Sequence, residues 1–317
     1  LPGGAVERFS LRKTPQMGLP KEIPHLPLGE TPRRGLLRRR APVFCICEFT
    51  FLRAPAVARR AERTGEDTAD WSPPTGFPDV YIAMGQTAEN VAEHKGVSRQ
   101  AQDEWGVRSQ NRAEAAQARG FFEREITPYT LPDGSVFSQD DGIRAGTNYE
   151  KVSQLSPVFR PDGTVTAGNA CPLNDGAAAV VVMSDTRAAE LGLKPLARIV
   201  SSGVSALSPE IMGLGPIGAI RQALGRAGMT ADDIDLFEIN EAFAAQVLPS
   251  AEEVGIDLDK LNVNGGAIAL GHPFGMTGAR IMTTLLNGLE DSDKEFGVES
   301  MCVGGGQGMA MVVQRLS

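Results

Sequence analysis

The regular alternation of strand-like and helix-like segments after residue 195 is the strongest constraint on the fold of this chain. Short apolar runs are each followed by a longer segment in which apolar residues recur with helical spacing. The predicted strands are 197–205, 236–239, 261–263, 298–303 and 309–314, and the predicted helices are 215–227, 241–254 and 275–289. This order is typical of an α/β fold with a largely parallel sheet and helices on its faces.

The preceding part, residues 61–194, gives a weaker pattern. Thr87 or Ser98 can cap the helices that follow them, and Ser98 opens a long amphipathic helix that we expect to end near Arg119. The segment Ala177–Met183 is continuously apolar. It predicts a strand that is buried on both faces.

Residues 1–60 have a different composition from the rest. They contain eight prolines, and ten Arg and two Lys stand against four Glu, a local net charge of +8. Prolines recur too often before Pro32 for a useful helix or strand, and only 43–52 could form a strand. We therefore expect 1–60 to be a poorly structured segment, followed by one domain over 61–194 and another over 195–317.

The composition excludes several classes of protein. The net charge of −8 gives no reason to expect nucleic acid, and no apolar run is long enough for a membrane span. The four cysteines lack the spacing of a secreted domain, so we expect free thiols and a cytoplasmic location. Neither HExxH nor paired CxxC motifs occur, so no bound metal is expected.

Three polar motifs follow predicted strands. Asn240 comes directly after 236–239, His272 lies in a glycine-rich stretch after 261–263, and Cys302 precedes three glycines that begin at Gly304. Sites in open α/β sheets form where strands end. Each motif also has a structural interpretation, since Asn240 could cap a helix, Cys302 could be an ordinary buried thiol and the glycines could serve a tight turn.

Taken together, the three motifs form a chemical set. His272 could take a proton from a thiol, and Cys302 could carry a proton to or from carbon. The backbone N–H of Gly304, and His272 with Asn240 acting through a water, could each stabilise an oxyanion. Acyl transfer with enolate formation needs these groups and no metal.

The blocks NEAFAAQ, NVNGGAIALGHPFGMTGARI and CVGGGQGMAM resemble the signature sequences of the thiolase family, the acyl-CoA C-acyltransferases. The resemblance covers about residues 79–317 and includes MGQTAENVA and AGNACPLNDGAAA. It implies a layered α/β/α fold with a complete C-terminal half and an incomplete N-terminal half. It also implies thiolysis of 3-ketoacyl-CoA by CoA or the reverse Claisen condensation, with coenzyme A and acyl-CoA as substrates and no bound cofactor.

By the same resemblance, His272 is the base that activates the nucleophile, Cys302 is the acid/base at the substrate α-carbon, Asn240 holds a catalytic water and Gly304 is an oxyanion donor. Arg144 becomes a candidate for the nucleotide phosphates, although it could equally be a solvated surface residue. Candidate walls for pantetheine or the acyl group, which could also be plain core residues, are Phe159, Met212 and Phe243. Two positions depart from the family pattern: Cys171 stands where many members have Ser, and Ala83 where His is common.

A larger departure concerns the nucleophile. The family's acyl-accepting cysteine lies in an N-R-x-C-x-S-G-like context in the first half, and the chain has no such block. The bulky neighbours of Cys45 and Cys47 do not suit a sharp nucleophile turn. We hypothesise that residues 1 to about 55 come from a wrong reading frame or a mis-called gene start.

The sequence thus favours a thiolase-type acyltransferase. One alternative is a non-catalytic thiolase remnant that binds CoA or a partner subunit, and another is a condensing enzyme of ketosynthase type on the same fold. The family resemblance implies a homo-oligomer, a dimer or tetramer, if the N-terminal half folds.

Overall fold

The computed structural model describes residue 76 and residues 78–316. The expectations for 1–60, for the possible strand 43–52 and for Cys45 and Cys47 lie outside the described residues. The α-helices are α2 (Met84–Lys95), α3 (Arg99–Ala118), α4 (Tyr149–Val152), α5 (Asp185–Glu190), α6 (Gly215–Ala227), α7 (Ala244–Val254), α8 (Ala267–Leu270) and α9 (Thr277–Asp291). The strands are β1 (Tyr129–Thr130), β2 (Val136–Phe137), β3 (Ala197–Ala206), β4 (Leu236–Ile239), β5 (Phe296–Val303) and β6 (Gln307–Arg315). Short 3-10 helices are η2 (Phe121–Arg124), η3 (Pro209–Leu214), η4 (Ala231–Asp233) and η5 (Leu258–Lys260).

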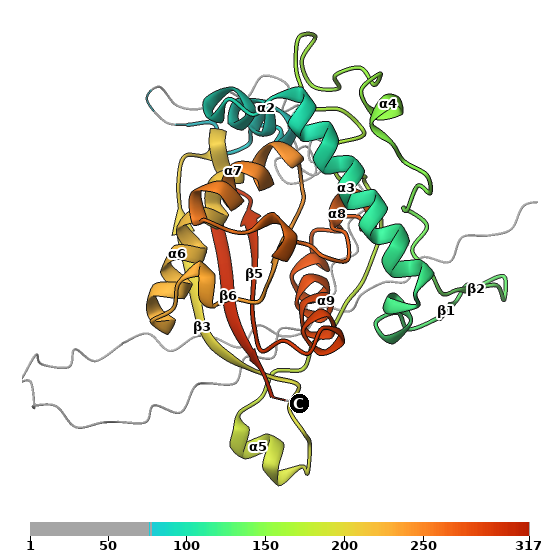
Figure 1. Ribbon diagram of the computed structural model, residues 1–317, viewed down its shortest axis with the longest axis vertical. Coiled ribbons are helices and arrows are strands. Elements are labelled where there is room, and N and C mark those ends of the chain that lie inside the picture. The colour runs from blue at the N-terminus through green and yellow to red at the C-terminus, as the bar shows by residue number, and fades with distance from the viewer. Residues whose placement is uncertain (1–75, 77, 317) are drawn as a thin grey trace, which may run out of the picture. The chain divides into compact units, whose positions relative to one another are not determined.

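The main sheet has four strands in the order β3-β6-β5-β4 and lies between helices (Figure 1). On one face, α6 sits close to β3, because Gly203 leaves no side chain in its way and the Ser201 hydroxyl donates to the Ala223 carbonyl. On the other face, Leu285 of α9 packs over Gly297 of β5. The expected layered α/β/α fold is confirmed.

Two hydrophobic clusters follow from the alternation of side chains along β4 and β6, whose neighbouring residues divide between them. Val298 points into a cluster that includes Trp105 of α3 and residues of α6 and α7. On the α9 side, Leu236 and Leu285 belong to a second cluster. Successive apolar residues of β4 and of β6 therefore face opposite sides of the sheet.

Most predicted elements after residue 195 match the structure. The helix 215–227 is observed as α6 and ends at Gly228, which adopts a left-handed conformation. In the first half, Ser98 caps α3 by accepting the Ala101 N–H at 3.1 Å. Thr87 is not a cap, because α2 begins at Met84 and Thr87 lies inside the helix.

The sheet is mixed and not largely parallel as expected. Only β4 and β5 pair in parallel, whereas β5–β6 and β3–β6 are antiparallel. The physical reason lies at Gly305 and Gly306, which both have left-handed backbones and turn the chain directly from β5 into β6. A short hairpin connection of this kind joins antiparallel strands only.

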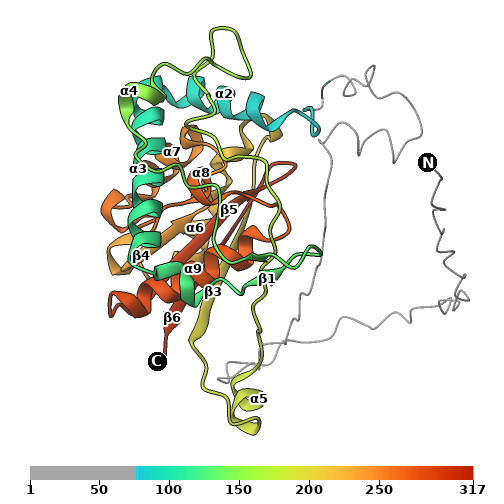
Figure 2. The ribbon, with the colours of Figure 1, turned by 90° about the vertical axis from the view of Figure 1, so that its right-hand side faces the viewer.

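Two predicted strands are wrong. Leu261 makes a single parallel bridge to Phe237, and the chain then turns, so 261–263 is no strand. The segment Ala177–Met183 runs as an unpaired stretch of chain just before α5 (Figure 2). Its Val181 is 84% exposed. A strand needs a neighbour for its N–H and C=O groups, and the described part of the chain supplies none beside this segment.

No helix within residues 78–316 is long and apolar enough to cross a membrane.

Two buried carboxyl groups lie side by side on the α9 face of the sheet. Glu238 of β4 and Glu299 of β5 are register partners and are 2% and 7% exposed. Burial raises the pKa of each to about 8, and the positive charge of Arg280 on α9 opposes the rise. Between pH 4.5 and about 8, Glu238 and Glu299 therefore keep their protons in the folded protein and lose them in the unfolded chain.

This arrangement predicts a stability that falls with rising pH. Because the folded pKa values of Glu238 and Glu299 lie near 8 and the ordinary value is 4.5, the free energy of unfolding decreases between these pH values. We expect Glu299→Gln to reduce this slope by about half, measured by urea unfolding from pH 5 to 8. Exposed Glu252 on α7 provides the control Glu252→Gln, and an unchanged slope in Glu299→Gln would contradict the assignment.

Candidate active site

The NEAF block lies between β4 and α7 and is fixed by backbone contacts. The Asn240 N–H donates to the Ser300 carbonyl of β5 at 3.0 Å. Phe243 forms an isolated antiparallel bridge with Ala170, and the Cys171 N–H donates to the Ala242 carbonyl at 3.0 Å. Because residues 240–243 take this extended path, the helix predicted from Glu241 begins only at Ala244.

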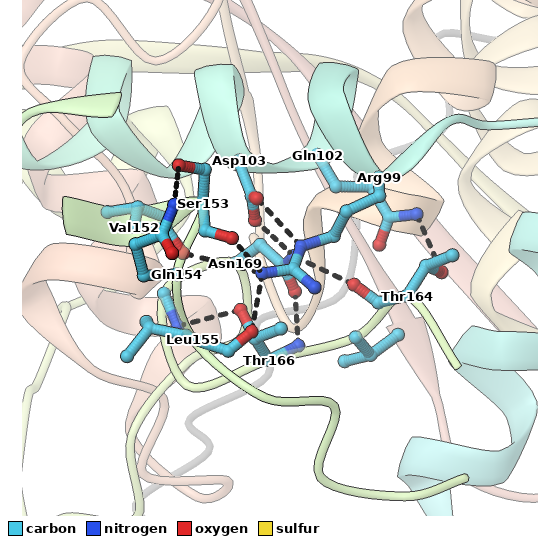
Figure 3. Close-up of polar contacts among 12 residues, drawn as sticks. Arg99, Gln102, Asp103, Val152, Ser153, Gln154, Leu155, Thr164, Thr166 and Asn169 are labelled. Atoms are coloured by element: carbon cyan, nitrogen blue, oxygen red, sulfur yellow. Dashed lines mark hydrogen bonds and ion pairs between the residues drawn. The ribbon is translucent and has the colours of Figure 1, made fainter. Parts of the chain in front are cut away.

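The other side of this bridge is anchored to α3 by a buried polar network (Figure 3). The Asp103 carboxylate accepts from Arg99 Nε at 2.7 Å and from Asn169 Nδ2 at 2.8 Å. Asn169 Oδ1 accepts the Thr166 N–H at 2.8 Å, and its backbone carbonyl accepts the Ala244 N–H at 2.9 Å. The AGNAC segment and the start of α7 are therefore held by one buried carboxylate.

The two thiols of the described residues lie in one cluster. Cys302 near the end of β5 is buried with Met212 and Ala242, and Cys171 and Phe243 pack against them. Both cysteines are free. Burial raises the pKa of Cys302 to about 11 and that of Cys171 to about 12, so both thiols are neutral at rest.

An aromatic pair continues from this cluster. The rings of Phe159 and Phe243 are 6.0 Å apart between centroids and meet edge to face. Phe159 lies directly on Gly85 of α2, where any side chain would overlap its ring. The structure thus brings Phe159, Met212 and Phe243 together beside Cys302, at positions predicted as pocket walls.

His272 is held in one tautomer by Thr277. Its Nδ1 lies 2.6 Å from Thr277 Oγ1, and the Thr277 hydroxyl donates its hydrogen to the Pro273 carbonyl at 2.9 Å. Since that hydroxyl has only one hydrogen, it accepts from Nδ1–H, which leaves the lone pair on Nε2. Burial and the charge of Arg280 lower the pKa of His272 to about 4.

The helix that follows His272, α9, packs against the strand that contains Cys302. Thr277 begins α9, and Gly278 in its first turn lies against the sulfur of Met301, the residue before Cys302. Gly304 follows at the hairpin turn, where the backbone is exposed and the position of a Cβ would be open space. The three motifs thus come from neighbouring elements at one end of β5.

Asn240 has an amide group without a partner. It is 1% exposed, and neither its Oδ1 nor its Nδ2 makes a hydrogen bond within the described residues. Phe243 occupies the N-cap position of α7, so the helix-cap interpretation of Asn240 does not hold. A buried amide with both groups unsatisfied costs free energy unless a water or ligand completes it.

Arg144 lies apart from these motifs on an exposed loop. Its backbone N–H donates to Gln110 of α3 at 2.8 Å, and its carbonyl accepts from the Thr147 hydroxyl at 2.6 Å. The backbone is therefore fixed while the side chain stays exposed. Both the anion-binding and the solvated interpretation fit this geometry, so its role stays a prediction.

Sequence reasoning missed Glu241, whose buried carboxyl group links the NEAF block to α3 and α8. Its carboxylate accepts from Trp105 Nε1 at 3.1 Å, Ser109 Oγ at 2.5 Å, Asn262 Nδ2 at 2.8 Å and the Ile268 N–H at 3.2 Å. Burial raises the pKa of this carboxyl, and these hydrogen bonds oppose the rise. The available signal was an acidic residue between an apolar strand and an apolar helix.

Arg280 was missed as well. All three guanidinium nitrogens are buried without a hydrogen-bond partner in the described part, and their charge acts on Glu238, Glu299 and His272. Nothing in the sequence distinguishes it from a surface arginine of a helix.

Within residues 78–316, no group of three or more His, Cys, Asp or Glu side chains is placed to hold a metal ion.

Two family models match the chain. Residues 52–186 match the thiolase N-terminal domain, and residues 193–315 match the thiolase C-terminal domain. The chain belongs to the thiolase family. Acetyl-CoA acetyltransferase of Cupriavidus necator is 52% identical over 246 residues, which are 76% of this chain and 63% of that protein. The acetyl-CoA acetyltransferase of Escherichia coli is 50% identical over 237 residues, 74% of this chain and 60% of that protein.

Solved thiolase structures share the fold. The acetyl-CoA acetyltransferase of Bacillus anthracis matches with a TM-score of 0.73 at 46% identity, over 76% of this chain and 62% of that chain. Human mitochondrial 3-ketoacyl-CoA thiolase matches with a TM-score of 0.71 at 42% identity, over 75% of this chain and 61% of that chain. The chain thus spans about three fifths of the length of these thiolases.

The Glu241 network predicts a large contribution to stability. Glu241→Ala would leave four donors without their acceptor, and each buried unsatisfied group costs about 1–3 kcal/mol. We expect the free energy of unfolding to fall by at least about 3 kcal/mol in urea titration. Exposed Glu252→Ala on the neighbouring helix should change it by less than about 0.5 kcal/mol, and equal effects of the two substitutions would refute the role of the network.

The Thr277 contact predicts the tautomer of His272. With only three histidines in the chain, long-range ¹H–¹⁵N spectra can resolve His272. We expect an Nδ1–H tautomer that stays neutral from pH 8 to 5, and a shift toward Nε2–H in Thr277→Val, which removes the acceptor.

The control is Thr283→Val on the same helix, because that hydroxyl donates to the Ala279 carbonyl and does not contact His272. An Nε2–H tautomer in the unsubstituted protein would contradict the assignment.

Proposed function

We propose that this chain carries the acid–base half of an acyl-CoA C-acyltransferase site that acts on CoA and 3-ketoacyl-CoA or acetyl-CoA. The observation that carries the proposal is the buried, unpartnered amide of Asn240 beside the strand that bears Cys302. In an apolar core, such an unpaired amide only destabilises the fold. In a site that binds a water next to a developing oxyanion, the same amide has a hydrogen-bonding role. Family membership and the names of the matched relatives support the same reaction class.

The roles in the proposed reaction follow from the protonation states. The lone pair on Nε2 of His272 accepts a proton from a thiol, and Nε2–H can then donate to the substrate carbonyl oxygen as charge develops there. In the condensation direction, Cys302 as the thiolate removes a proton from the α-carbon, the enolate forms the new C–C bond, and the proton then passes from Cys302 to the departing thiolate. In the cleavage direction, Cys302 as the thiol donates its proton to the α-carbon as the C–C bond breaks. Asn240 with its water and the exposed backbone of Gly304 complete the two oxyanion sites.

The proposal also covers substrate binding. Phe159, Met212 and Phe243 wall the pantetheine or acyl group, and Arg144 contacts the nucleotide phosphates. Neither Cys171 nor Cys302 lies in the N-R-x-C-x-S-G-like setting that the family resemblance implies for the nucleophile. The proposal is therefore limited to the acid–base half of the site.

Further expectations are part of the same proposal. We place the domain division at 194/195, the location in the cytoplasm, and the assembly as a homo-oligomer. The alternative of a remnant that only binds CoA differs from the proposal in one property, since binding alone exchanges no α proton.

The exchange of α protons therefore tests the proposed function. The full chain is incubated with acetyl-CoA in D₂O, and deuterium in the acetyl methyl group is followed by NMR. We expect exchange above the uncatalysed rate and a loss of at least about 100-fold in Cys302→Ser, since a hydroxyl is a far weaker acid than a thiol.

Cys171→Ser is the matched control, because this thiol lies in the same cluster but has no role in the proposed proton transfer. Its rate should stay within about threefold of the unsubstituted protein. Exchange that persists in Cys302→Ser, or that does not occur in the full chain, would overturn the proposal.

A further inference from the structure

The segment from Ala170 to Gly176 connects two of the three motifs. At its start, Cys171 is tied to the NEAF block through its N–H bond to the Ala242 carbonyl. At its end, Gly176 lies against the side chains of Pro273 and Met276, where a Cβ would come within 2.8 Å of both. The segment is thus held at both ends across the site.

Asn174 makes the contact with His272 in this segment. Its side-chain Oδ1 accepts the backbone N–H of His272 at 3.1 Å. Its amide also lies directly on Gly271, so a side chain at that position would overlap it. Gly271 has a φ of 88°, and this left-handed backbone turns the chain so that the His272 N–H faces Asn174.

Two contacts then define the position of His272. Asn174 fixes its backbone N–H, and Thr277 fixes its ring through Nδ1. The Thr277 contact fixes the rotation of the imidazole ring. Because Thr277 is only five residues from His272 in the chain, this contact does not fix the loop relative to the rest of the protein. Asn174 provides a hydrogen bond from this loop to a segment about 100 residues earlier in the chain.

The contact between Asn174 and His272 does not contribute to the hydrophobic core, because Asn174 is exposed. Asn174 is exposed, and its only other hydrogen bond within residues 78–316 is a 3.4 Å contact from Nδ2 to the adjacent Asp175 carbonyl. An exposed amide of this kind contributes little to folding. The hydrogen bond instead fixes the position of the His272 backbone, and the position of Nε2 depends on that backbone.

We propose that Asn174 is a positioning residue for His272, which places the imidazole through the hydrogen bond to its backbone N–H and through contact with Gly271. The inference rests on the proposed function only in so far as His272 acts as a base. A misplacement of about 1 Å in a reacting group can reduce a rate by about 100-fold.

Two substitutions separate positioning from charge. Asn174→Leu has a similar size but no acceptor, whereas Asn174→Asp keeps an acceptor oxygen and adds a negative charge. In Asn174→Leu we expect altered ¹⁵N shifts of His272 and a fall of about 10- to 100-fold in α-proton exchange of acetyl-CoA. In Asn174→Asp we expect exchange restored to within about fivefold and a His272 pKa moved upward, because a nearby negative charge favours the imidazolium.

The control is Asn111→Leu, which removes an exposed amide on α3. It should leave the His272 signals and the exchange rate unchanged, and all three variants should keep the melting temperature of the unsubstituted chain within a few degrees. Unchanged His272 shifts in a folded Asn174→Leu variant would overturn the proposal. Since the NMR readout needs no turnover, an absence of exchange in every variant would count against the proposed function and not against the positioning role.

Discussion

The site depends on one buried carboxylate. Glu241 lies between Asn240 and the rest of the NEAF block and accepts four hydrogen bonds from α3, from Asn262 and from the start of α8. Gly266 leaves the space that this carboxylate occupies. A buried carboxyl group with four hydrogen-bond partners tolerates few alternative arrangements, because each displaced donor is left unsatisfied. The strand end that bears Asn240 and the loop that leads to His272 are therefore fixed relative to each other.

A second carboxylate applies the same principle on the other side of the NEAF block. Asp103 holds Asn169, and Asn169 holds the first turn of α7 and the residues that bridge to Phe243. Both carboxylates reach across from their own elements to segments more than 60 residues away. Long-range polar contacts of this kind make a loop as well defined as a helix, which is what a site built on loops requires.

The sequence predicted the C-terminal elements well where the signal was local. The helix 215–227 and the strand 236–239 have the bounds that their apolar spacing and terminal glycine indicate. Predictions failed where the outcome depended on a partner. Ala177–Met183 has the composition of a buried strand, but no strand lies beside it among the described residues. The strand at 261–263 was lost to the turn that brings the Asn262 side chain to Glu241.

The site shows the same division between local and long-range information. Among the proposed site residues, Asn240 and Cys302 lie at the carboxyl ends of β4 and β5, as their apolar runs indicate, whereas His272 follows α8 and not the predicted strand 261–263. The residues that control them could not be predicted, since Glu241, Thr277 and Arg280 look like ordinary helix or loop residues in a linear sequence. Their importance comes from burial and from partners that only the fold brings together.

In the proposed reaction, the charges cannot form readily before a substrate is bound. Burial and the charge of Arg280 disfavour an imidazolium at His272, and burial disfavours a thiolate at Cys302, so both groups are neutral near pH 7. Proton transfer from a thiol to His272 separates charge in a poorly solvated place, which is costly unless both charges gain partners. A carbonyl oxygen held near Nε2–H would provide such a partner for the imidazolium as negative charge moves from sulfur through the α-carbon to oxygen. In the proposed reaction, this neutral resting state would limit unproductive thiolate formation and would couple proton transfer to the binding of an enolisable thioester.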